Sequence, residues 1–132
     1  VSESHDAGQT WGPIRFDEEL PEIWCQPNAI SLPSTEGEDR IVFANASLML
    51  PFRGCGVIRL SLDGGRTWRY SRTLNPGHHV YQCMCVLPDG RIGLLWENEC
   101  QGLYFSRLPL SWFDAGIEAI EPHTTADQDG CL

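Results

Sequence analysis

A pattern of five residues that occurs twice is the feature that most restricts how this chain can fold. The pattern Ser-x-Asp-x-Gly-x-Thr-Trp begins at Ser4 and again at Ser61, 57 residues later. We expect its aspartate to accept hydrogen bonds from backbone N–H groups of a tight turn, and its glycine to supply a positive φ. Each copy therefore predicts a turn between two antiparallel strands. The structural residues are Ser4, Asp6, Gly8, Thr10 and Trp11, and Ser61, Asp63, Gly65, Thr67 and Trp68.

Short runs rich in β-forming residues fill most of the remaining sequence, and no helical stripe of useful length interrupts them. The predicted strands are residues 29–32, 40–44, 57–61, 68–73, 80–87, 91–97 and 103–108. Asp89-Gly90 is a strong hairpin signal between two of these runs. Residues 109–120 are expected to form a short helical or irregular closure, and residues 121–132 a frayed tail.

The spacing of these strands predicts an all-β fold that is part of a β-propeller. Four strands between residues 29 and 73 make one blade, with the second turn between its third and fourth strands. Residues 1–11 and those after them are expected to form the outer two strands of the preceding blade, and Tyr81 to begin a third. Two to three blades cannot close a ring, so we expect a truncated piece or one completed by another polypeptide. A β-sandwich is the competing architecture.

Charge and cysteine content restrict the partners of the chain. Its net charge of −9 disfavours nucleic acid and anionic membrane surfaces, and no apolar run is long enough for a membrane span. The six cysteines allow a disulfide framework with 15 possible pairings. Cys83 and Cys85 fall on one face of a predicted strand, which favours buried free thiols. No cofactor or metal site is expected, because the cysteine and histidine spacings do not suit zinc.

Several segments, taken in order, resemble the late part of exo-α-sialidases (neuraminidases), enzymes whose turn motif is called the Asp box. These are residues 39–45, Arg53, residues 57–61 with the second turn, Asn75-Pro76-Gly77-His78-His79-Val80-Tyr81, and residues 87–97, which begin Leu-Pro-Asp-Gly. The resemblance covers residues 1–114. It implies a six-bladed propeller, with residues 1–120 forming its C-terminal blades. The sequence departs from the family pattern at Gln82, where serine is frequent, and at Trp96, where tyrosine is frequent.

The same resemblance implies roles for two residues. By motif position, Arg53 matches the third of three arginines that bind the sialic acid carboxylate, and Tyr81 matches the nucleophile. A neutral phenol avoids the repulsion that a carboxylate nucleophile would meet beside the substrate carboxylate, and arginine binds that carboxylate through two parallel hydrogen bonds. The other two arginines, the acid/base aspartate and the glutamate partner of the tyrosine come from earlier blades in the family.

Other polar residues have simpler interpretations. Arg59 is expected to be structural, and His78 and His79 to be an ordinary loop pair. Glu97 and Glu99 are weak candidates for the base of Tyr81. Asn45-Ala46-Ser47 is a formal glycosylation sequon.

These observations predict part of a retaining exo-α-sialidase that acts on sialylated glycans, with the isolated chain inactive. The alternatives are a non-catalytic module that binds glycan or protein, a piece that assembles with copies of itself, and a degenerate pseudoenzyme.

Overall fold

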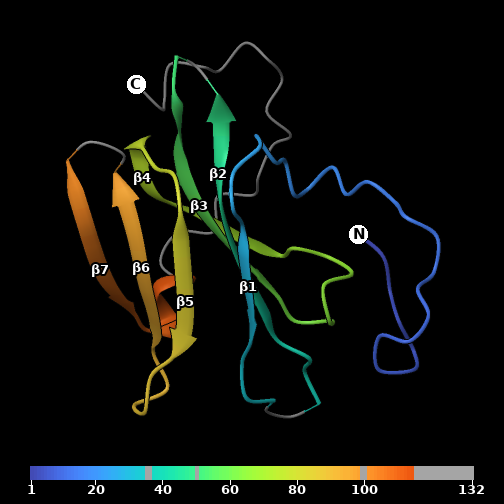
Figure 1. The fold of residues 1–132 in the computed structure, drawn as a ribbon. Coiled ribbons are helices and arrows are strands. Elements are labelled where there is room, and N and C mark those ends of the chain that lie inside the picture. Colours follow the sequence, from blue (N-terminus) through green and yellow to red (C-terminus); the bar gives the residue numbers. More distant parts are fainter. Residues whose placement is uncertain (35–36, 50, 99–100, 115–132) are drawn as a thin grey trace.

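The computed structural model describes residues 1–34, 37–49, 51–98 and 101–114, and in them the chain forms two antiparallel sheets (Figure 1). The first sheet has four strands in the order of the sequence. They are β1 (Asn28–Ser31), β2 (Ile41–Met49), β3 (Arg53–Ser61) and β4 (Tyr70–His78). The second turn motif joins β3 to β4, as the sequence predicts. This sheet is the predicted four-stranded blade.

The second sheet has three strands and continues the chain beyond the first. It contains β5 (Gln82–Val86), β6 (Ile92–Asn98) and β7 (Gly102–Leu108), also in sequence order. A 3₁₀ turn, η1 (Leu110–Trp112), follows. The guanidinium of Arg72 lies 4.4 Å from the ring centroid of Trp112 and donates to its carbonyl oxygen, which attaches η1 to the first sheet. The predicted tail, residues 121–132, lies outside the described residues.

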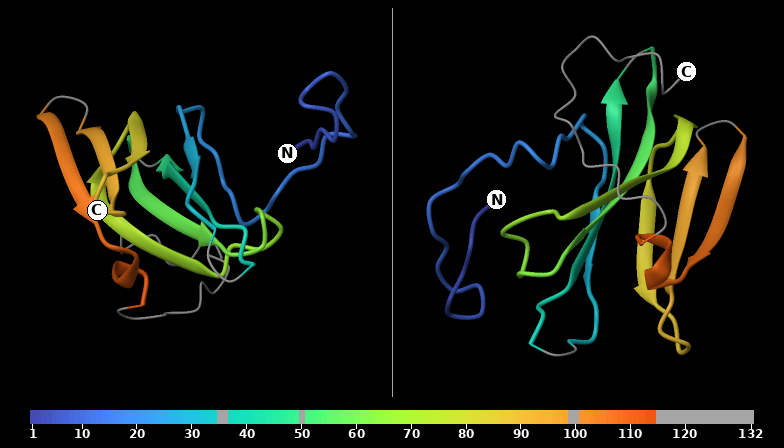
Figure 2. Two further views of the ribbon diagram at one scale, coloured as in Figure 1. Left: turned by 90° about the horizontal axis from the view of Figure 1, so that it is seen from below. Right: turned by 180° about the vertical axis from the view of Figure 1, so that it is seen from behind.

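The hydrophobic core lies between the two sheets. Strand β1 runs beside β5, so the sheets face one another like adjacent blades (Figures 1 and 2). Apolar side chains from both fill this space. They are Leu32, Val42, Ala44, Ile58 and Leu60 from the first part of the chain, and Met84, Ile92, Leu94, Leu108 and Phe113 from the second. The predicted all-β fold, part of a propeller, is confirmed.

The N-terminal segment differs from its prediction. Residues 1–27 contain no assigned strand, although Gly12 N donates to Glu3 O at 2.8 Å and Arg15 N donates to Val1 O at 2.8 Å. The hairpin at its start, residues 1–15, projects away from both sheets (Figure 2), whereas Glu19, Pro21 and Cys25 are hydrogen-bonded to residues in or next to them. Trp11 is 66% exposed, whereas its counterpart Trp68 is buried against Phe43. The described residues include no sheet that covers this hairpin. The outer strands predicted here are therefore not assigned, and a few backbone hydrogen bonds stand in their place.

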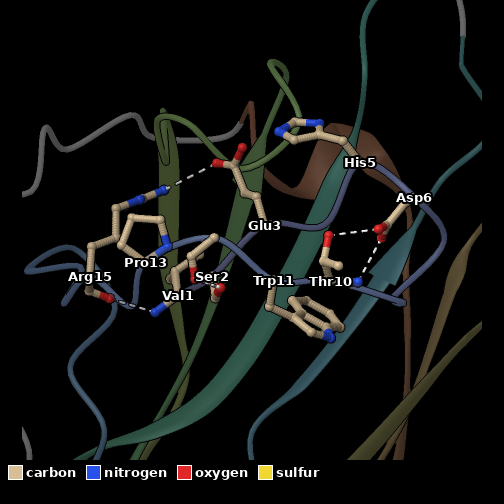
Figure 3. Close-up of a pocket in the computed structure, with 10 residues that line it drawn as sticks. Val1, Ser2, Glu3, His5, Asp6, Thr10, Trp11, Pro13 and Arg15 are labelled. Carbon is tan, nitrogen blue, oxygen red and sulfur yellow. Dashed lines mark hydrogen bonds and ion pairs between the residues drawn. The ribbon is translucent and has the colours of Figure 1, made fainter.

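Both turn motifs have three hydrogen bonds to the aspartate carboxylate in common. In the first, the carboxylate of Asp6 accepts from Thr10 Oγ1 at 2.6 Å and from Thr10 N at 2.9 Å (Figure 3), and also from Ser4 Oγ at 2.8 Å. In the second, Asp63 accepts from Thr67 Oγ1 at 2.7 Å, Thr67 N at 2.9 Å and Ser61 Oγ at 2.8 Å. In each turn, one aspartate carboxylate thus accepts hydrogen bonds from the serine before it and from the threonine after it.

These hydrogen bonds predict a loss of stability in acid. The threonine hydroxyl, with further help from the threonine N–H and the serine, lowers the pKa of Asp6 to about 2 and lowers the pKa of Asp63 as well. Because the folded-state pKa is below the unfolded value, this stabilisation is present above about pH 4 and is lost as the pH falls towards 2.

We therefore expect Asp63→Asn to lower the melting temperature at neutral pH and to flatten its dependence on pH below 4. Thermal unfolding followed by circular dichroism measures both. Asp114→Asn, in an exposed residue after η1, is the matched control. An unchanged melting temperature for Asp63→Asn would mean that the turn contributes nothing to the fold.

The cysteines differ in part from their prediction. Cys55 is in a disulfide, while Cys25, Cys83 and Cys85 are free thiols. Cys83 and Cys85 share one face of β5, as predicted, but that face is exposed rather than buried. The prediction of burial is wrong for these two residues because the alternation of a strand specifies which side chains share a face, and the neighbouring element decides which face is covered.

Candidate functional site

Arg53 and Tyr81 meet where the two sheets adjoin, although 28 positions separate them in the sequence. Arg53 is the first residue of β3, and Tyr81 immediately precedes β5. Arg53 Nη1 lies 3.3 Å from Tyr81 Oη, and Arg53 Cζ lies 5.3 Å from the tyrosine ring centroid. Tyr81 is 45% exposed. The pair therefore presents a guanidinium and a phenol oxygen together at the surface.

A bulge in β3 sets the position of Arg53. The β3–β4 register shifts between Gly54 and Gly56, and Cys55 between them has a φ of 54°. A Cβ on Gly54 would lie 2.8 Å from the carbonyl oxygen of Gly77, so only glycine permits this approach. The side of the bulge nearest Arg53 is thus packed closely against the end of β4.

Backbone hydrogen bonds from β6 hold the segment that carries Tyr81. Val80 N donates to Glu97 O at 3.1 Å, and Glu97 N donates to Tyr81 O at 3.0 Å. The thiol of Cys25 donates to Val80 O at 2.8 Å. Burial raises the pKa of this thiol, which keeps it protonated as a donor. The structure therefore joins Glu97 to Tyr81 through the backbone.

An aromatic pair lies beside Arg53 at the edge of the site. Phe52 is 54% exposed, and its ring meets that of His78 edge-on with the centroids 4.3 Å apart. Asn75 Nδ2 donates to His78 O, and Gly77 N donates to Asn75 Oδ1 at 3.2 Å. The Pro-Gly stretch that precedes Tyr81 is therefore folded onto itself.

Arg59 lies away from this pair, in the interior. It is 5% exposed and its Nη1 donates to Asn45 Oδ1 at 2.8 Å. Burial lowers its pKa to about 10. Asn45 is itself fully buried, and its amide nitrogen donates to Pro21 O, so the sequon at this position is closed to glycosylation in this fold.

Two of the remaining candidates, Asp6 and Asp63, are also separate from the Arg53–Tyr81 pair. Asp6 lines an open pocket of the N-terminal hairpin together with Val1, Glu3, Trp11 and Arg15, a surface formed wholly by residues 1–15 (Figure 3). Asp63 lies in the second turn, at the other end of β3 from Arg53. His79, expected to be one of an ordinary loop pair, lies in the loop before β5 and is 1% exposed. Glu99 lies outside the described residues.

Cys25, Gln82 and His79 support the site through contacts that the sequence did not indicate. In the sequence, Gln82 is distinguished only as a departure from the sialidase pattern. In the described part of the chain, no group of three or more histidine, cysteine or acidic side chains is arranged to hold a metal ion. Nor do those residues include a helix that is long and apolar enough to cross a membrane.

Two known proteins that are similar to this chain in sequence are sialidases. A sialidase from Micromonospora viridifaciens is 31% identical over 131 residues, which cover 96% of this chain and 20% of that protein. A sialidase from Bacteroides fragilis (strain YCH46) is 29% identical over 117 residues, covering 83% of this chain and 21% of that protein. No family profile matches the chain. The resemblance to sialidases is confirmed, over about a fifth of the length of these relatives.

Solved structures show the same fold. The leech intramolecular trans-sialidase, in complex with 2,7-anhydro-Neu5Ac, superposes with a TM-score of 0.69 at 23% identity, covering 85% of this chain and 20% of that one. The intramolecular trans-sialidase of Ruminococcus gnavus, in complex with oseltamivir carboxylate, gives a TM-score of 0.68 at 21% identity, covering 87% and 28%. At these identities the likeness establishes the arrangement of the strands.

Proposed function

We propose, from the premise that this chain is a relative of the sialidases over one part of their length, that it supplies two active-site residues of an exo-α-sialidase. The enzyme removes terminal sialic acid from glycoconjugates with retention of configuration. Tyr81 is the nucleophile, and Arg53 binds the sialic acid carboxylate.

The contact between Arg53 and Tyr81 is the observation that carries this proposal. In sialic acid the carboxylate is bonded to the anomeric carbon, so one group must bind the carboxylate directly beside the group that attacks. A guanidinium 3.3 Å from a phenol oxygen satisfies that requirement. A base takes the phenol proton as Tyr81 Oη attacks the anomeric carbon, and an acid protonates the glycosidic oxygen as its bond to that carbon breaks. The glycosyl–tyrosine intermediate that forms is then hydrolysed by water.

The chemistry also needs groups from elsewhere in the whole protein. In the sialidase family the base for the tyrosine, the acid and two further arginines lie on earlier blades. The structure has apolar surface available for such blades at both ends. Leu95, Leu103 and Phe105 are exposed beside Cys83 and Cys85 on the second sheet, and Trp11, Ile14 and Phe16 are exposed on the N-terminal segment. We assign these surfaces to neighbouring blades.

Turnover of a fluorogenic sialoside tests the proposal. We expect no turnover by this chain alone, and clear turnover by a protein extended upstream with the sequence that precedes it in the gene. In the extended protein, Arg53→Gln should lower kcat/KM by about 100-fold, because the carboxylate of the bound sialic acid loses a charge-assisted pair of hydrogen bonds. Arg91→Gln, at an exposed arginine paired with Asp89, is the control and should change little.

Two results would contradict the proposal. An extended protein that folds but does not turn over any sialoside would favour the non-catalytic module. Turnover by this chain alone, abolished by Tyr81→Phe, would show that the missing groups are not required.

A further inference from the structure

In the loop of residues 79–81 and the first residue of β5, Gln82, only Tyr81 points outward. His79, Val80 and Gln82 are 1%, 0% and 4% exposed, whereas Tyr81 is 45% exposed. His79 Nε2 and Gln82 Oε1 lie 2.7 Å apart, so the side chains on either side of Tyr81 are bonded to each other beneath it. This hydrogen bond fixes the backbone on both sides of Tyr81 and so limits the orientations of the tyrosine side chain.

The imidazole of His79 is closely packed between Trp96 and Gly56. Its ring stacks on Trp96, with centroids 5.1 Å apart and an interplanar angle of 22°. On another side it lies against Gly56, where a Cβ would come within 2.3 Å of His79 Nδ1. Trp96 in turn stacks on Tyr104 at 4.6 Å and donates from Nε1 to Ser106 Oγ at 3.1 Å. The ring therefore has little freedom to move.

The direction of the hydrogen bond follows from the other partners of Gln82. Its amide nitrogen donates to Ala44 O at 3.3 Å and to Gln26 O, so its oxygen is the atom that faces His79. An oxygen can only accept, and His79 Nε2 must therefore carry the hydrogen. Burial also lowers the pKa of His79, in keeping with a neutral ring. His79 is thus a fixed neutral donor.

The backbone of His79 reaches the other half of the site. Its N–H donates to the carbonyl oxygen of Arg53 at 3.3 Å. One residue is therefore bonded to Arg53 through its backbone and to the residue after Tyr81 through its side chain. Gln82 and Trp96, the two positions at which the sequence departs from the sialidase pattern, are both direct contacts of His79.

We infer that His79 is a positioning residue, which holds the phenol of Tyr81 against the guanidinium of Arg53. It acts through Gln82 and has no role in bond making. The geometric part of this inference concerns the chain itself, and its catalytic meaning rests on the proposed function.

Nuclear magnetic resonance of the chain with ¹³C-labelled tyrosine tests the geometry without substrate. His79→Phe keeps a flat ring that can stack on Trp96 but removes the donor to Gln82. We expect the Tyr81 ¹³Cζ signal to shift and its nuclear Overhauser contact with the Arg53 side chain to be lost. His79→Gln, which restores an N–H donor, should return both signals towards those of the unmodified chain. Should His79→Phe fail to fold, Gln82→Met removes the acceptor instead and carries the same expectation.

Unchanged Tyr81 signals in a folded His79→Phe or Gln82→Met chain would overturn the inference. In the extended protein, the same variants should lower kcat about tenfold with little change in KM, as expected for misplacement of the attacking oxygen. The two proposals fail separately. If His79 controls the Arg53–Tyr81 contact but Tyr81→Phe leaves turnover intact, the proposed function is wrong and the positioning role remains.

Discussion

Tyr81→Phe is expected to lower kcat of the upstream-extended protein by about 10³-fold, while leaving its folding unchanged. The substitution removes only the oxygen that would attack the anomeric carbon, and it leaves the ring that packs near Arg53. Since Tyr81 is 45% exposed and Arg53 retains solvent access, loss of the hydroxyl should cost little stability. Steady-state kinetics with a fluorogenic sialoside, together with a melting curve, measure both effects.

The matched control is Tyr70→Phe, which removes the hydroxyl of a half-buried tyrosine on β4. It should leave kcat unchanged. A fluorinated sialoside whose covalent intermediate hydrolyses slowly adds a direct readout, because the peptide that contains Tyr81 should gain the mass of the sugar. Unchanged kcat for Tyr81→Phe, or a label on a carboxylate instead, would remove Tyr81 from the nucleophile role.

The sequence is sufficient to predict the strands of this chain, because their determinants are local. Alternating apolar residues and turn chemistry act over a few positions. They predict the seven strands of the described residues, with Ile41–Met49 and Tyr70–His78 extending several residues beyond the predicted ends and Arg53–Ser61 beginning before its predicted start at residue 57. The N-terminal hairpin is the exception. Its turn forms as the motif predicts, but strand pairing there lacks a covering sheet.

The candidate site depends on contacts that local patterns do not encode. The resemblance to sialidases selects Arg53 and Tyr81, but their 3.3 Å separation follows from the packing of β1 beside β5 and from the bulge after Arg53. The role of His79 is hidden for the same reason. The sequence predicts an ordinary loop histidine after the Pro-Gly stretch, and its burial depends on Gly56 and Trp96 from two other strands.

Because the site spans two sheets, we expect a core substitution far from it to destabilise the fold and to weaken the contact between Arg53 and Tyr81. Ile58 is 1% exposed and belongs to the cluster that joins the sheet of Arg53 to the sheet that follows Tyr81. Ile58→Ala should lower the free energy of unfolding by about 2–5 kcal/mol. It removes buried methyl and methylene groups and leaves a cavity that movement of the two sheets can fill only in part.

Urea unfolding of the chain measures this loss as a lower midpoint with an unchanged slope. Thr73→Ala, at an exposed position on β4, should change the free energy by less than about 0.5 kcal/mol. Below the unfolding transition, the Tyr81–Arg53 nuclear Overhauser contact should weaken in Ile58→Ala and persist in Thr73→Ala. If Ile58→Ala destabilised the chain but left that contact intact, the hydrogen bonds of His79 and Glu97 alone would be enough to hold the site, independently of the core between the sheets.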